Sequence, residues 1–193
     1  MSDPAYHSQV HRTHNARIAV MTSRASVEWY TPAHIIRRVR AVMGAIDLDP
    51  ASCEEANRTV QARRIYTARE DGLLQSWQAP TLYLNPPYGK AIDPFIHRLD
   101  HDYRSGIVGE ALALVPARVD TRWWQRLVDY PVCLVEGRIT FSNAKNGAAF
   151  PCGIFYLGGR EDRFVEEFSG LGAIWRCVSR PAGATQLLLG AAE

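Results

Sequence analysis

The sequence predicts an α/β fold in which a mostly parallel β-sheet is covered by helices on both faces. Short apolar runs with the length of strands alternate with segments whose apolar residues recur at helical spacing. This alternation is typical of parallel sheets, whose strands are joined by crossover helices. At 193 residues, 47% of them hydrophobic and 22% charged, the chain has the composition of a globular domain with a substantial core. A hairpin-like pair of strands near the C-terminal end is expected to add an antiparallel edge.

Local signals predict the elements in chain order. The first helix is predicted to begin at Thr31-Pro32, since threonine can cap a helix and proline suits its first position. Its apolar residues recur at helical spacing as far as Met43, and Gly44 ends the run. The other predicted elements are strands over 45–48, 64–67, 81–84, 111–115, 132–135 and 152–157, helices over 54–63, 92–103, 120–128 and 163–169, a loop over 69–78, and either a last strand or an unstructured run over 173–178.

No repeat or linker divides the chain, which predicts a polar N-terminal tail over residues 1–24 and a single domain over residues 25–193. No apolar run approaches the roughly 20 residues that span a bilayer, and the N-terminus lacks the apolar segment of a secretory signal. The four cysteines are scattered, which favours reduced thiols over disulfides or a zinc site. The sequence therefore predicts a cytoplasmic protein with no membrane segment and no metal.

The strongest functional pattern is Asn85-Pro86-Pro87-Tyr88, directly after the strand predicted over residues 81–84. Open α/β sheets bind ligands at the carboxyl ends of their strands. The two prolines fix the backbone and remove two N–H groups, so that nearby carbonyl oxygens are left to point into a cleft. The Asn85 side-chain oxygen and the Pro86 carbonyl can accept both hydrogens of a planar amine, and Tyr88 offers a ring for stacking. This arrangement favours methyl transfer to an amino nitrogen; the alternative is a proline-rich turn with a packed tyrosine.

With its neighbours, this motif resembles the catalytic motif of S-adenosylmethionine-dependent amino-methyltransferases. The wider chain resembles the phage-type DNA N6-adenine methyltransferases, the phage Dam family, from about Glu28 to about Gly172. The matching segments are 28–32, 46–52, 70–73 with Trp77, 84–89, 114–118, 120–123, and 137–139 with Phe141.

The resemblance implies a Rossmann-like class I methyltransferase fold. It implies S-adenosyl-L-methionine as cofactor, and methyl transfer to the adenine N6 amino group of double-stranded DNA after the base has been flipped out. It also implies a phage or prophage gene whose product acts in the cytoplasm of a bacterial host.

The resemblance also implies where the cofactor binds. The first-strand loop usually carries glycines after its acid, but Ser52, Cys53 and Glu54 stand there, and Asp47 is an alternative to Asp49. Asp71 resembles the acid that reads the cofactor adenine, although an Asp-Gly turn fits equally. The ribose ligand is left open, with Glu70 as the nearest candidate. The predicted cofactor-binding residues are Trp29, Tyr30, Thr31, Pro32, Asp47, Asp49, Pro50, Ala51, Asp71 and Asn85.

The catalytic and substrate-binding residues are predicted in the same way. Arginines interleaved with aromatics suit phosphates and extruded bases, although Trp123 and Trp124 can also begin an amphipathic helix with at least one of them in the core. The polar stretch over residues 138–150 is either a recognition loop or a plain surface loop. The predicted catalytic residues are Asn85, Pro86, Pro87 and Tyr88, and the predicted substrate-binding residues are Tyr88, Lys90, Arg118, Arg122, Trp123 and Arg138.

Three alternatives to DNA adenine share the same chemistry: RNA adenine, the N4 amine of cytosine, and the side-chain amide of protein glutamine. The many arginines favour a nucleic acid, because only Lys90 and Lys145 of the 22 basic residues are lysines. A GC-rich gene would give the same bias. A further alternative is a methyltransferase-like module that binds DNA without turnover. The target sequence and the oligomeric state are left open.

Overall fold

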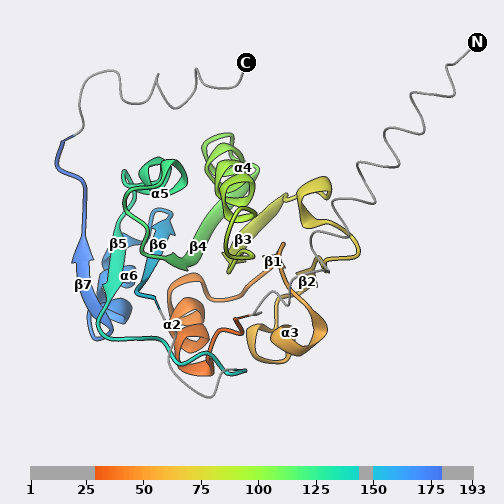
Figure 1. Ribbon diagram of the computed structural model, residues 1–193, viewed down its shortest axis with the longest axis horizontal. Helices are drawn as coiled ribbons and strands as arrows, with labels where there is room; N and C mark the ends of the chain where they lie inside the picture. The colour runs from red at the N-terminus through yellow and green to blue at the C-terminus, as the bar shows by residue number, and fades with distance from the viewer. Residues whose placement is uncertain (1–28, 144–149, 180–193) are drawn as a thin grey trace, which may run out of the picture.

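The computed structural model of the protein describes residues 29–143 and 150–179 (Figure 1). The tail predicted over residues 1–24 lies outside the described residues. So do Lys145, Asn146 and Gly147 of the expected recognition loop. Within the described residues, every element predicted from the sequence is present and in the predicted order.

Helices and strands alternate through most of the chain. The helices are α2 (Ala33–Met43), α3 (Glu54–Val60), the short 3₁₀ helix η1 (Gly72–Leu74), α4 (Ile92–Arg104), α5 (Arg122–Leu127) and α6 (Glu161–Phe168). The strands are β1 (Leu48–Asp49), β2 (Arg64–Ile65), β3 (Ala79–Leu84), β4 (Val108–Pro116), β5 (Val132–Val135), β6 (Cys152–Leu157) and β7 (Gly172–Trp175). The first two strands are shorter than predicted, and the segment predicted as a loop over 69–78 contains η1.

The described strands form one seven-stranded sheet in the order β2-β1-β3-β4-β6-β5-β7 (Figure 1). β1 to β4 pair in parallel, as predicted. The antiparallel part predicted near the C-terminal end is present: β6, β5 and β7 follow β4 in the sheet, and β6 lies between β4 and β5. The physical reason is burial: all six residues of β6 are buried, whereas β7, the true edge strand, is partly exposed throughout.

Helices cover both faces of the sheet, so the core has two halves. Alternate residues of β4 point to opposite faces: Leu112 and Leu114 join α2 and α6, while Ala111 and Ala113 join α4 and α5. The parallel strands β1, β2 and β3 therefore end at one shared edge, with helices on either side. No helix among the described residues is long and apolar enough to cross a membrane.

Candidate active site

The Asn85 amide lies directly after β3, at the shared carboxyl edge of the parallel strands. Its Nδ2 group donates hydrogen bonds to the Trp29 carbonyl oxygen at 2.5 Å and to the Thr31 hydroxyl at 3.3 Å. Its Oδ1 atom is buried and has no hydrogen-bond partner among the described residues. Buried polar atoms are rarely left without a partner. Asn85 therefore offers an oriented acceptor at the sheet edge.

Thr31 does not cap α2, which corrects the sequence prediction. Pro32 is the N-cap, and its carbonyl oxygen accepts hydrogen bonds from the backbone N–H groups of Ile35 and Ile36. The Thr31 hydroxyl instead lies 2.7 Å from the hydroxyl of Tyr83 in β3. Burial raises the pKa of Tyr83 far above its ordinary value, so this phenol stays neutral. The hydroxyl of Thr31 thus contacts Asn85 and Tyr83 and does not cap the helix.

The Tyr88 ring packs in a cluster of aromatic side chains. It meets Phe150 at 5.3 Å and Phe141 at 6.5 Å between ring centroids, both edge to face. Trp29 closes the cluster, 5.1 Å from Phe141 and 5.4 Å from Phe150. The Tyr88 hydroxyl is buried with no partner among the described residues, and burial raises its pKa. The packing of the ring supports the interpretation of Tyr88 as a packed tyrosine. Because neither neighbouring ring lies parallel to it, the interpretation of Tyr88 as a ring for stacking is supported as well.

Asp49 lies at the carboxyl end of β1, whereas Asp47 lies before its first residue. Asp49 ends β1 and is buried, with its carboxylate accepting from the Ala51 N–H at 3.2 Å. Burial raises its pKa to about 7. Asp47 precedes β1, pairs with Arg63 at 2.9 Å and accepts a hydrogen bond from the Thr81 hydroxyl at 2.8 Å. Asp47 is therefore held in a structural ion pair away from the carboxyl edge, which favours Asp49 as the acid near a ligand.

The raised pKa of Asp49 predicts how stability depends on pH. Between its ordinary pKa of 3.8 and about 7, the folded chain holds a proton that the unfolded chain has released. The contribution of this group to folding therefore falls as pH rises through that window and is constant above it. Asp49→Asn removes this dependence. Urea unfolding at about pH 5 and pH 8 measures the free energy of unfolding of the variant and of the native chain. The difference between the two should shift in favour of the variant as pH rises to about 7, on the order of 1 kcal/mol per pH unit. A difference that does not change with pH would contradict a raised pKa.

Gly72 brings the turn containing Asp71 against the exit of β1. A Cβ atom at Gly72 would lie 1.9 Å from the Pro50 carbonyl oxygen, so only glycine allows this approach. Asp71 has a positive φ of 51°, and its carboxylate accepts from the Leu73 N–H at 3.2 Å. The turn interpretation of Asp71 is thus confirmed, and the turn lies against Pro50, directly after β1. Gly72 is not among the site residues predicted from the sequence, although the Asp71-Gly72 pair is the sequence pattern that indicates this turn.

Gly72→Ala is expected to destabilise the fold and weaken cofactor binding together. The added methyl meets a backbone oxygen, which cannot rotate away, so the loss is expected to reach or exceed the about 1–3 kcal/mol typical of overpacking. Thermal unfolding and calorimetric titration with S-adenosylmethionine measure the two effects. Gly159→Ala is the matched control, because a Cβ there meets nothing within 4 Å. Equal melting temperatures for the two variants would refute the close approach.

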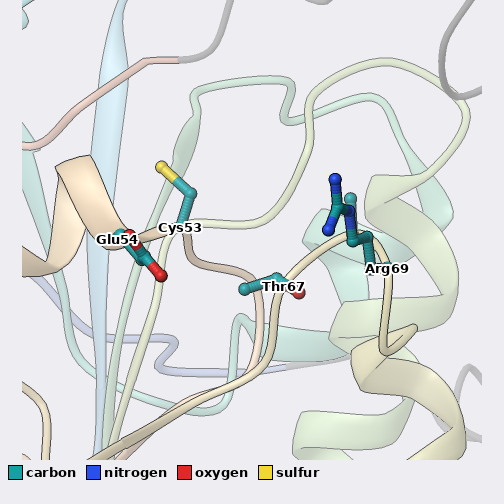
Figure 2. A pocket seen from close by; sticks show the side chains of 5 residues that line it. Cys53, Glu54, Thr67 and Arg69 are labelled. Atoms are coloured by element: carbon teal, nitrogen blue, oxygen red, sulfur yellow. The ribbon is translucent and has the colours of Figure 1, made fainter.

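A cavity of about 460 Å³ opens between the start of α3 and the loop after β2 (Figure 2). Figure 2 shows Cys53 and Glu54 at the start of α3, across from Thr67 and Arg69 on the loop. Sequence reasoning missed this lining, because Cys53 and Glu54 stood where glycines were expected. Glu70 does not line the cavity: its carboxylate accepts hydrogen bonds from the N–H and hydroxyl of Thr67. Glu54 is therefore the carboxylate that lines the cavity.

The segment from Trp29 to Thr31 connects this cavity with Asn85. The Cys53 thiol lies 3.6 Å from the Tyr30 hydroxyl. It also caps α3, because it accepts a hydrogen bond from the Ala56 N–H. One residue earlier, the Trp29 carbonyl holds the Asn85 amide. A ligand in the cavity and a group bound at Asn85 would thus both be next to one short segment.

The predicted cationic residues are exposed. Lys90 follows β3, Arg118 follows β4 and Arg138 follows β5, all at the carboxyl edge, and Arg122 begins α5. Arg118 also lies 3.7 Å from Asp120 in an exposed ion pair, which is a weak restraint. These side chains surround the edge at which Asn85 lies.

Trp123 is not on this surface, which corrects its prediction as a substrate-binding residue. It is 7% exposed and packs with Trp124 at 6.1 Å between ring centroids. Both rings belong to the core between α5, α4 and the sheet, because a helix of six residues must bury its largest side chains to dock. The alternative interpretation, in which at least one of Trp123 and Trp124 lies in the core, is thus confirmed for both.

The mixed sheet, with its parallel core and antiparallel strands, and the motif after β3 are consistent with an α/β methyltransferase fold. A family model described as DNA N-6-adenine-methyltransferase (Dam) matches residues 20–153, more than half of the chain. The chain belongs to this family, whose members methylate the N6 amine of adenine in DNA. No curated protein matches the chain.

Proposed function

We propose that this enzyme binds S-adenosylmethionine along the carboxyl ends of β1, β2 and β3, and methylates an adenine that has been flipped out of double-stranded DNA onto the Asn85–Tyr88 motif. The observation that carries the proposal is the buried Asn85 Oδ1 atom, an acceptor without a partner among the described residues. An exocyclic amine is the group that such an acceptor fits.

The target amine would be held by two acceptors. Asn85 Oδ1 and the Pro86 carbonyl oxygen would take one N–H each, which draws the nitrogen lone pair out of conjugation with the ring. S-adenosylmethionine supplies a methyl group already activated by its sulfonium. Positioning by the chain then accounts for most of the catalysis, since no base needs to deprotonate the amine first.

The residues at the edge fit the cofactor. The cavity of about 460 Å³ lies in the range of small-molecule sites, and its lining combines the Glu54 carboxylate and the Thr67 side chain, which suit ribose hydroxyls. Asp71, on the turn held by Gly72, would accept the cofactor's adenine amine. Asp49 and Tyr30 would complete the wall between this cavity and Asn85.

DNA would bind across the same edge. Exposed Lys90, Arg118, Arg122 and Arg138 would meet phosphates, and each such contact adds salt dependence to binding without reading the sequence. The base must leave the stack because its amine is otherwise out of reach. The Tyr88 ring would stack on the flipped base.

Methylation with labelled S-adenosylmethionine tests the proposal. Duplex DNA, RNA and protein are offered together, and the products are analysed by nucleoside and amino-acid mass spectrometry. N6-methyladenine in DNA is expected. N4-methylcytosine or methylglutamine as the main product would overturn the substrate, and cofactor binding by calorimetry without any turnover would indicate a binding module.

A further inference from the structure

We propose that Trp29, Thr31 and Tyr83 are positioning residues that fix the orientation of the Asn85 amide, and that they make asparagine, and not aspartate, the residue this site requires. The inference rests on the proposed function, in which Asn85 Oδ1 holds the target amine.

The first observation is the Trp29 carbonyl. It lies 2.5 Å from Asn85 Nδ2, and a carbonyl oxygen can only accept. A flip of the amide would set Oδ1 against this oxygen and lose the hydrogen bond. The Trp29 carbonyl therefore determines that the oxygen of Asn85 faces away from the 29–31 segment.

The second observation is the hydroxyl pair of Thr31 and Tyr83. Thr31 accepts from Asn85 Nδ2 at 3.3 Å and lies 2.7 Å from the Tyr83 hydroxyl. Tyr83 is fully buried, and Thr31 is 2% exposed. Buried hydroxyls are costly unless they are bonded, so the pair is held together and cannot turn to solvent. Because the hydroxyl of Thr31 does not cap α2, it is left to link the Tyr83 hydroxyl to the Asn85 amide.

These contacts favour an amide at position 85 and disfavour an ionised carboxylate there. An ionised carboxylate has no donor and would face the Trp29 carbonyl with a second oxygen. A protonated carboxyl group has one O–H, which can donate to Trp29 while its other oxygen still accepts. Aspartate at this position should therefore work only when it is protonated.

Asn85→Asp and Asn85→Ala test this against each other. Single-turnover rates are measured from about pH 5.5 to pH 8.5 and divided by the native rate at each pH. The Asn85→Asp ratio should match that of Asn85→Ala at the alkaline end and rise as pH falls, by up to about tenfold per unit. The Asn85→Ala ratio should stay flat. An Asn85→Asp ratio that does not change with pH, at any level, overturns the inference. A native rate in Asn85→Ala overturns the proposed function instead.

Thr31 and Tyr83 are tested by paired variants. Thr31→Val should lower kcat by about three- to tenfold, the loss expected for one neutral hydrogen bond, with the Kd for S-adenosylmethionine and the KM for DNA unchanged. Thr31→Ser keeps the hydroxyl and should keep the native kcat. Tyr83→Phe should lower kcat by no more than Thr31→Val, and the double variant should lose no more than Thr31→Val alone. Thr59→Val on α3 is the matched control and should not change kcat. Native kcat per active molecule in Thr31→Val, with only a lower melting temperature, would show a structural role and overturn the inference.

Discussion

Replacing Asn85 by alanine is expected to abolish methyl transfer while S-adenosylmethionine binding stays largely intact. In the proposed function the Oδ1 atom holds the target amine and not the cofactor, and the Nδ2 group already donates to Trp29 and Thr31. Loss of an oriented hydrogen bond to a reacting group costs a few kcal/mol in the transition state, roughly a hundredfold or more in rate. Single-turnover methylation of duplex DNA measures the rate, and calorimetry measures the cofactor Kd.

Thermal unfolding of the Asn85→Ala variant serves as the control for its stability. Alanine leaves the Trp29 carbonyl and the Thr31 hydroxyl without their donor, so a small decrease in melting temperature is expected. The rate is therefore compared per folded molecule, below the unfolding transition. Near-native turnover would remove Asn85 from the chemistry. A cofactor Kd weakened as strongly as the rate would move its role to the cofactor.

The fold could be predicted because its signals are local. Helical spacing up to Met43 and the stop at Gly44 define α2, and an apolar strand running into two prolines places Asn85 at a carboxyl end. The position of β6 could not be predicted in this way. All its residues are buried, so it lacks the alternation that distinguishes an edge strand, and its pairing with β4 joins segments far apart in the chain.

The site could be predicted only as far as its motif. Tyr83 looks like an ordinary strand residue, and its bond to Thr31 spans 52 positions, which no local pattern reveals. The approach of Gly72 to the Pro50 carbonyl is likewise a tertiary contact. Trp123 was misplaced for a related reason: a tryptophan beside arginines has the same local pattern whether its ring faces DNA or the core.

Replacing Tyr88 by alanine is expected to reduce both stability and activity. The ring packs edge to face on Phe141 and Phe150, so its removal leaves a cavity in the aromatic cluster. A fully buried aromatic ring is worth about 3–5 kcal/mol, and the loss here is smaller because Tyr88 is only partly buried. If the ring also stacks on the flipped base, the variant loses a further about 1–3 kcal/mol in the methylation reaction, roughly 5- to 150-fold in kcat/KM for DNA.

Tyr88→Phe separates the two contributions, because it keeps the ring and removes only the hydroxyl. That hydroxyl is buried with no partner among the described residues, so its loss should leave the melting temperature unchanged or slightly higher. Activity should also be retained, since stacking depends on the ring face. For Tyr88→Ala, the deciding quantity is therefore kcat/KM per folded molecule relative to Tyr88→Phe. A large decrease supports stacking on the base, whereas equal values beside a lower melting temperature would assign Tyr88 to packing alone.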